Sequence, residues 1–185
     1  MTNDMEPPLR PRLVPDRAMP PYAYVPGRQP HPVRDPRGHS FGREPDTPDP
    51  PDPQCWRACH AYLYGIDLFN HGYYWEAHEA WEALWHACGR RGPAGTFFKA
   101  LIGLAAAGLK VRMGNPRGVR GHARLAANRF QEIALGSRAD EARYMGLDLH
   151  ALSRRAGDVA ERPPVGEDAG SSAGGVVFDF VLRPE

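Results

Sequence analysis

The chain has 185 residues, a formal net charge of +1 at pH 7 and 20 prolines. This length favours one domain with a real core, and the small net charge gives no general attraction to nucleic acid or to an anionic membrane. The first residues lack the charged, apolar and small-residue regions of a secretory signal, and the longest nearly apolar run, residues 100–109, is shorter than the roughly 20 residues of a bilayer span. We therefore expect a soluble, cytoplasmic protein with no nucleic-acid or membrane partner.

Residues 1–54 form a proline-rich arm that holds 15 of the 20 prolines. Proline lacks a backbone N–H and fixes φ, so this segment cannot build a helix or a central strand. Its end, residues 43–53, is acidic and typical of a stiff, extended linker. Residues 20–42 contain aromatic residues, which disordered linkers seldom have. Two interpretations stay open: a floppy tail, or an extended arm that lies over the globular part with its aromatic residues as anchors.

The next two segments are predicted to be helices. Residues 55–69 place apolar side chains at helical spacing, and the sequence Asn70-His71-Gly72 then favours a break because Asn and Gly tolerate the left-handed conformation. The second helix is expected at residues 73–88 and ends before Gly89. The cysteines Cys55, Cys59 and Cys88 are odd in number and lack paired CxxC spacing, which favours buried thiols over a zinc site.

Three more helices follow in the sequence. The third, at residues 93–113, is apolar nearly all round and rich in small residues, which predicts a central position in a bundle. The fourth is expected at residues 116–135 after the stop signal Gly114-Asn115. For the fifth, Ser137 and Asp140 resemble a capping pair. Its apolar stripe consists of Met145, Leu149, Leu152 and Ala156.

The C-terminal segment differs from the helices. After Arg162 the sequence is typical of a flexible spacer. Residues 176–182 then alternate between two sets of side chains, a strand-like pattern. A lone strand needs a partner, and the proline-rich arm is the only obvious one.

The segment 73–88 carries the most unusual chemistry, and a helical wheel separates its core face from a polar arc. The core face contains Leu84, Ala77, Cys88, Trp81, Tyr74 and Trp85. The polar arc contains His78, Glu82, Trp75, His86 and Glu79, and Glu76 lies beyond it among alanines. The large apolar area of Trp75 favours burial. We therefore expect another helix, the arm or a second subunit to cover this arc.

Covering the arc would remove Glu79 and Glu82 from water, and a buried carboxylate needs a cation, a metal or several hydrogen bonds. In a structural interpretation, His78 and Glu82 form an i, i+4 pair, and Lys99 or an arginine neutralises the remaining charge. In a functional interpretation, His78, Glu82 and either Glu79 or His86 project into a pocket, with Glu76 as a further candidate. They bind a divalent metal or act as acid and base on a small molecule. The candidate binding side chains around it are Asn70, Trp75, Trp81, Trp85 and Lys99.

The metal interpretation has His78 and Glu82 as its tentative ligands, and zinc, iron or manganese would suit them. The E-x-x-H spacing of helical di-iron proteins is absent, which makes the signal weaker. A second ligand-bearing helix is also needed. Its histidine or acidic options are His60, Asp67 and His122.

Residues 69–85 contain the motif Phe69-Asn70-x-Gly72-x-Tyr74-Trp75-Glu76-x-His78-Glu79-x-Trp81-Glu82-x-x-Trp85. This motif resembles the signature of the bacterial and archaeal domain-of-unknown-function family 309. Residues 97–107 and 115–118 resemble the next helix and turn of that family, and the whole resemblance covers residues 56–135. It implies a small all-helical domain with the His-Glu stretch facing inward, and it implies no reaction. Many members carry Gln where this chain has Gly103, so a polar group that could line the same site is missing.

Together the patterns predict an all-α fold: a compact array of about five helices at residues 55–160, with the arm at 1–54 and a flexible tail with a strand-like end at 161–185. The preferred function is an uncharacterised helical domain whose enclosed Trp/His/Glu cluster is a structural network or binds a small ligand. One alternative is a metal-dependent, hydrolytic enzyme with the catalytic candidates Glu76, His78, Glu79 and Glu82. Another is a protein-interaction module that uses the arm. A homo-oligomer stays possible.

Overall fold

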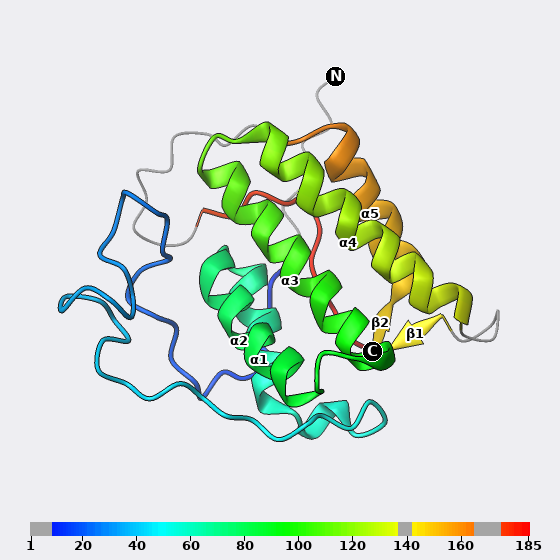
Figure 1. Ribbon diagram of the computed structural model, residues 1–185, viewed down its shortest axis with the longest axis horizontal. Coiled ribbons are helices and arrows are strands. Elements are labelled where there is room, and N and C mark those ends of the chain that lie inside the picture. Colours follow the sequence, from blue (N-terminus) through cyan, green and yellow to red (C-terminus); the bar gives the residue numbers. More distant parts are fainter. Residues whose placement is uncertain (1–8, 137–141, 165–174) are drawn as a thin grey trace.

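A computed structural model describes residues 9–136, 142–164 and 175–185 of the chain (Figure 1). These residues form an array of five α-helices with one small hairpin, which confirms the predicted all-α fold. The helices are α1 (His60–Asn70), α2 (Tyr74–Ala87), α3 (Gly92–Arg112), α4 (Pro116–Gly136) and α5 (Leu149–Glu161), preceded by a 3-10 turn at Trp56–Ala58. The hairpin strands are β1 (Arg143–Tyr144) and β2 (Leu147–Asp148).

Each helix packs against the next one in the sequence, from α1 to α5. Helix α3 therefore lies between the α1–α2 pair and the α4–α5 pair (Figure 1). It is buried on most sides, as its apolar composition predicts. The core between the helices is rich in aromatic rings, and its largest fully buried side chains include Trp81, Tyr62 and Tyr74.

Two glycines allow the first three helices to approach one another closely. A Cβ atom on Gly65 of α1 would lie 2.3 Å from Nε1 of Trp81 on α2, and one on Gly108 of α3 would lie 2.6 Å from the ring of Tyr74. Both distances are well inside van der Waals contact. The large rings of α2 therefore pack directly on the backbones of α1 and α3.

The turns between the first helices follow the sequence signals. Gly72 has φ of 83° and Gly89 has φ of 66°, so both glycines adopt the left-handed conformation that ends a helix. The predicted capping pair at residues 137 and 140 lies outside the described residues.

Met145 does not belong to the fifth helix, which corrects the predicted stripe. Met145 (φ 48°) and Gly146 (φ 80°) are the two central residues of the hairpin turn, because Tyr144 pairs with Leu147. A two-residue hairpin needs positive φ at these positions, and this requirement outweighs the helical spacing of Met145. Helix α5 begins only after Asp148, whose Oδ1 accepts the Ala151 N–H at 2.8 Å.

The C-terminal tail, residues 175–185, alternates in burial but forms no strand in the described part of the chain. Phe178, Phe180 and Leu182 are buried, whereas the residues between them are more exposed. The ring of Phe178 stacks on Phe69 of α1 at 5.4 Å. The predicted alternation is therefore correct for residues 177–182, whereas Val176 is 41% exposed. Side chains of α1, α2 and the arm, rather than a second strand, bind the tail backbone.

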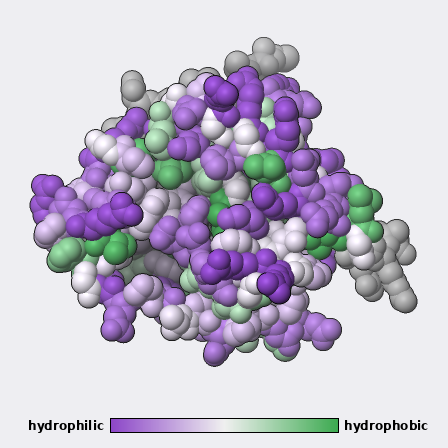
Figure 2. Space-filling view, viewed as in Figure 1, coloured by the Kyte–Doolittle hydropathy of each residue, from purple (hydrophilic) through white to green (hydrophobic). Residues whose placement is uncertain are grey.

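Helix α3 is long and apolar enough, by length and composition, to cross a membrane. Most of its apolar window is buried against the rest of the protein, as expected for the core helix of a soluble protein. The face of the molecule shown in Figure 2 is largely hydrophilic, with hydrophobic residues in small separate areas.

Candidate functional site

A buried polar stripe runs along α1 where the arm crosses it. The stripe consists of Tyr64, Asp67 and Asn70, which follow one another at a spacing of three residues and are all buried. Asp67 is 0% exposed. A buried carboxylate is costly unless each oxygen receives hydrogen bonds, so its partners determine what this stripe does.

Among the described residues, the hydrogen-bond donors to the Asp67 carboxylate come from the arm. Oδ2 accepts Nε–H of Arg12 at 3.0 Å and the Val14 N–H at 2.9 Å, and Oδ1 accepts the Leu13 N–H at 2.7 Å. Two successive backbone amides and one guanidinium therefore satisfy a fully buried negative charge. This arrangement binds the arm through its main chain as well as through one side chain.

Asn70 binds the tail in a similar way. Its Oδ1 accepts the Leu182 N–H at 2.9 Å, and its Nδ2 donates to the Leu182 carbonyl at 2.8 Å. Arg10 of the arm then joins the two segments, because its guanidinium donates to the carbonyl oxygens of Asn70, Phe178 and Phe180. Asn70 is one of the predicted binding residues, and its side chain binds a segment of the same chain.

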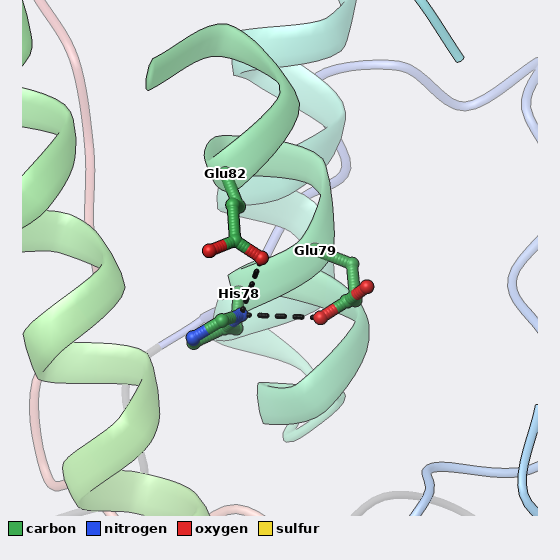
Figure 3. Close-up of side chains that lie close together, drawn as sticks. All are labelled: His78, Glu79 and Glu82. Atoms are coloured by element: carbon green, nitrogen blue, oxygen red, sulfur yellow. Dashed lines mark ion pairs between the residues drawn. The ribbon is translucent and has the colours of Figure 1, made fainter. Parts of the chain in front are cut away.

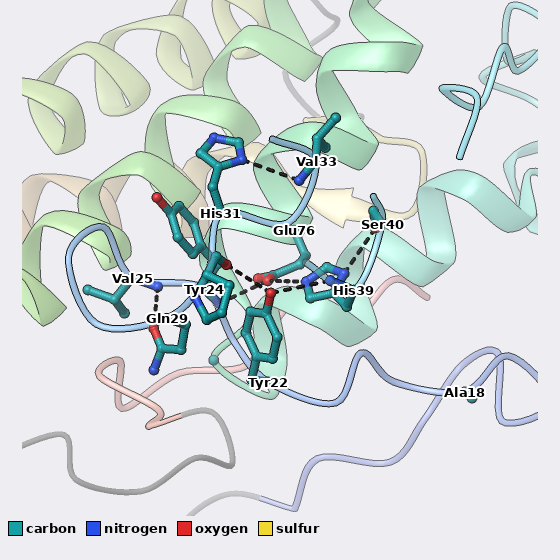
Figure 4. Close-up of polar contacts among 12 residues, drawn as sticks. Ala18, Tyr22, Tyr24, Val25, Gln29, His31, Val33, His39, Ser40 and Glu76 are labelled. Atoms are coloured by element: carbon teal, nitrogen blue, oxygen red, sulfur yellow. Dashed lines mark hydrogen bonds and ion pairs between the residues drawn. The ribbon is translucent and has the colours of Figure 1, made fainter. Parts of the chain in front are cut away.

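The second buried carboxylate is Glu76, in the first turn of α2 (Figure 4). Its Oε1 accepts the Tyr24 N–H at 2.9 Å and lies 3.2 Å from Nε2 of His39. The other ring nitrogen of His39 is 2.9 Å from Oγ of Ser40. Both side chains of the His39–Glu76 pair are almost completely buried, at 6% and 5% exposure.

The arm also covers Trp75. The rings of Tyr24 and His31 pack edge-on against the indole with centroid distances of 5.4 and 5.6 Å. Tyr22 closes this part of the arm on itself, since its hydroxyl donates to the Pro30 carbonyl at 2.8 Å. Of the two interpretations of the arm, the described residues show the one in which aromatic anchors lie over the globular part.

The arm covers a different carboxylate from the one expected. The wheel placed Glu76 beyond the covered arc and predicted that Glu79 and Glu82 would be enclosed. In the structure Glu76 is buried, whereas the side chains of Glu79 and Glu82 are 45% and 36% exposed. The reason is that Glu76 and Trp75 lie at the start of α2, where the arm crosses, while the two other acids lie one and two turns farther along.

His78, Glu79 and Glu82 form a cluster on the surface of α2 (Figure 3). Nδ1 of His78 lies 3.3 Å from Oε1 of Glu79 and 4.0 Å from Oε2 of Glu82. One ligand atom from each residue lies within 4.8 Å of the others, a separation that a single metal ion could bridge. His78 is 29% exposed and its Nδ1 is buried, so the predicted inward orientation of this stretch holds for Glu76 and in part for His78, but not for Glu79 and Glu82.

His122 of α4 lies close enough to His78 for their charges to interact. Burial lowers the pKa of His122, and the charges of Lys110 and His78 lower it further. Among the residues that the structure describes, the group close enough to hold one metal ion consists of His78, Glu79 and Glu82 of α2. His122 does not belong to this group, so α4 does not supply the second set of ligands that the metal interpretation requires.

The remaining binding candidates have packing roles. Trp81 is fully buried, and its Nε1 donates to the Tyr62 carbonyl at 3.4 Å. The ammonium of Lys99 lies 4.0 Å from the ring centroid of Trp85, so this lysine makes a cation–π contact. The prediction that Lys99 neutralises the carboxylates is not supported by any ion pair between described residues.

Glu76 also has an oppositely charged neighbour on α3. Arg112 is 4% exposed, and its Nη1 donates to the Gly72 carbonyl at 3.3 Å. Burial lowers the pKa of Arg112, whereas interactions with Tyr74 and Glu76 raise it. The sequence patterns did not predict Arg112, Tyr64 or the arm's Arg12 as part of the site, and they offered Asp67 only as a metal ligand. The one available signal was an acidic residue within the apolar sequence of the first helix.

Residues 62–121 match the model of a family described as a domain of unknown function, DUF309. The match confirms the resemblance inferred from the sequence and covers most of α1, all of α2 and α3, and the start of α4. Asp67, Asn70 and Glu76 lie inside the matched segment, whereas the arm and the tail that they bind lie outside it. A comparison with curated proteins finds no match.

Proposed function

We propose that this chain is a non-catalytic helical module that binds an extended polypeptide segment, and that its own proline-rich arm occupies the binding surface. The observation that carries this proposal is Asp67, a fully buried carboxylate that accepts three hydrogen bonds from the arm. The binding surface is defined as Tyr64, Asp67, Asn70, Trp75 and Glu76.

Two features support a binding surface over an ordinary packed core. Contacts to the arm use its backbone: Leu13, Val14 and Tyr24 each donate a main-chain N–H to a buried carboxylate. Main-chain bonds with side-chain pockets between them are typical of peptide recognition. The segment that joins the arm to the helices, residues 43–54, is mostly exposed, so it acts as a tether.

The proposal is tested by cutting the tether in the full-length protein. A recognition sequence for a site-specific protease is inserted between Asp49 and Pro50, which are both exposed. After cleavage, the arm fragment should co-elute with the helical part in size-exclusion chromatography at micromolar concentration. An arm that separates from the otherwise wild-type protein on cleavage would contradict the proposal.

Asp67→Asn should release the cleaved arm. The carboxylate accepts hydrogen bonds on both oxygens, whereas the side-chain amide of Asn would place an N–H donor opposite a donor of the arm. The matched control is Asp158→Asn, which changes an exposed acid on α5 and should leave the arm bound. Equal retention in the two variants would show that Asp67 does not hold the arm.

The second candidate function is divalent metal binding by His78, Glu79 and Glu82, favoured by the 4.8 Å grouping of their ligand atoms. A histidine nitrogen and two carboxylates suit zinc, iron or manganese, and an exposed site would leave positions open for a water or a substrate. A metal-dependent hydrolytic activity would depend on this site, and Glu76, whose Oε1 contacts Tyr24 and His39 of the arm, lies outside the grouping.

Metal binding is measured by elemental analysis and by titration of the purified protein with Zn²⁺ and Mn²⁺. One bound ion per chain that disappears in His78→Ala, but not in His86→Ala on the same helix, would support the site. His86 is the matched control because it is exposed and does not belong to the cluster. Binding that is equal in both variants, or absent from the wild type, would remove this candidate.

We also propose a cytoplasmic location, which the free thiols of the three cysteines suit.

A further inference from the structure

The arm forms a compact turn where it meets Asp67. The Arg17 N–H donates to the Val14 carbonyl at 3.2 Å, which closes a four-residue turn with Pro15 in its second position. Proline is favoured there because its fixed φ suits this position. Pro15 and Asp16 are exposed, so the turn points away from the helices.

The guanidinium of Arg12 fastens this turn to the helical part. Its Nε–H donates to Asp67 Oδ2, while Nη2 donates to the Val14 carbonyl at 2.7 Å and to the Arg17 carbonyl. One side chain therefore binds the buried carboxylate through Nε and both ends of the turn through Nη2. A planar guanidinium has five N–H donors in a fixed arrangement, whereas a lysine has one compact ammonium group at the end of its stem.

The residues between the two arginines are also constrained. The N–H groups of Leu13 and Val14 both bind Asp67, so neither position can be proline. Their side chains are partly buried against the hydrophobic core, which favours apolar residues.

The second arginine has its own subsite on Tyr64. The guanidinium carbon of Arg17 lies 4.0 Å from the Tyr64 ring centroid, and the Tyr64 hydroxyl donates to the Ala18 carbonyl at 2.9 Å. A flat cation over an aromatic face is an attractive contact. Tyr64 and Asp67 lie three residues apart on α1, so one helix face contacts both ends of the turn.

We propose that Tyr64 and Asp67 form a sequence-reading site for the motif Arg-apolar-apolar-Pro-x-Arg, and that this site accepts such a segment from a separate polypeptide. Residues 12–17, Arg-Leu-Val-Pro-Asp-Arg, are the occupant within this chain. The inference rests on the proposed peptide-binding function and adds the identity of the recognised segment.

The experiment uses the full-length protein cleaved in the tether and a fluorescently labelled synthetic peptide of residues 9–42. The labelled peptide should exchange with the cleaved arm, and unlabelled variants then compete with it. Arg12→Lys should weaken competition at least ~10-fold, because the charged bond to Asp67 and the bonds to the turn cannot all be kept. Leu13→Pro, which removes one N–H donor, should weaken it as much.

The control peptide carries Arg34→Lys, a conservative change at an exposed position, and should compete like the wild type within about 2-fold. If the wild-type peptide exchanges and the Arg12→Lys peptide competes equally well, the sequence-reading inference is overturned while the peptide-binding function stands. If the wild-type peptide neither binds nor exchanges after cleavage, the proposed function fails together with the inference.

Discussion

Asn70 and Leu182 exchange two hydrogen bonds in which a side-chain amide takes the place of a neighbouring strand. The Leu182 N–H donates to Oδ1 at 2.9 Å, and Nδ2 donates to the Leu182 carbonyl at 2.8 Å. Both residues are 2% exposed. A strand-like segment needs partners for its backbone groups, and here one asparagine at the end of α1 supplies both.

Asn70→Asp should detach the tail at neutral pH. The carboxylate can still accept the Leu182 N–H, but it cannot donate to the carbonyl, and it places a negative charge beside that oxygen. An unpaired buried carbonyl costs about 1–3 kcal/mol. Chemical denaturation should show a loss of this size, and limited proteolysis should cut near residue 182. Asn128→Asp, on the exposed side of α4, is the control and should change neither result.

Helices α2, α3 and α4 could be predicted because their apolar spacing and end signals agree. The first helix shows what apolar spacing does not predict. Its apolar positions predicted one buried face, yet Tyr64, Asp67 and Asn70 on its other sides are also buried. Periodicity detects the face that packs on other helices, but it does not detect coverage by an irregular segment such as the arm, whose contacts involve main-chain groups.

For the same reason, only part of the candidate site could be predicted from the sequence. The stranded Trp75 correctly indicated a cover over α2, and the aromatic residues of the arm provide it. Which carboxylate lies beneath that cover depends on where the arm crosses the helix, and the helical wheel holds no information on this. Glu76 is enclosed and Glu79 is not because the arm passes over the first turn of α2.

Gly65→Ala and Gly108→Ala should each destabilise the protein by several kcal/mol. The added Cβ would lie 2.3 Å from Trp81 Nε1 or 2.6 Å from the Tyr74 ring, and a buried ring between two helices has little room to move. Gly121→Ala is the matched control, because nothing lies within 4 Å of its Cβ position on α4. It should stabilise the protein by about 0.5–1 kcal/mol. Urea denaturation of the three variants gives the comparison, and similar stabilities for Gly65→Ala and Gly121→Ala would contradict the close helix contact.

Glu76→Ala should expose the Tyr24 amide, and Glu76→Gln should expose it much less. The Tyr24 N–H donates to Glu76 Oε1 at 2.9 Å, and glutamine retains a carbonyl oxygen at that position. Glutamine removes only the negative charge of the carboxylate that contacts Nε2 of His39. Hydrogen exchange at the Tyr24 amide measures the effect directly. Glu79→Ala, an exposed acid on the same helix, should leave that amide protected; faster exchange in this control would show that the helix rather than the bond was disturbed.

The stability of the tail contact should fall above pH 10 because of Tyr74. Burial raises the pKa of Tyr74 to about 12 from the ordinary value of 10.0. A folded-state pKa above the unfolded value means that its contribution is fully present below pH 10 and is lost as the pH rises toward 12. The loss should reach about 2 kcal/mol near pH 12.

Tyr74→Phe separates this effect from other titrating groups, including Tyr144, whose pKa burial also raises to about 12. At pH 8 the variant should be less stable by about 1 kcal/mol, because the Tyr74 hydroxyl accepts the Val177 N–H at 3.0 Å. Phenylalanine cannot ionise, so urea denaturation from pH 8 to 12 should show the two stability curves converging and then crossing. Curves that stay parallel over this range would show that folding does not raise the pKa of Tyr74.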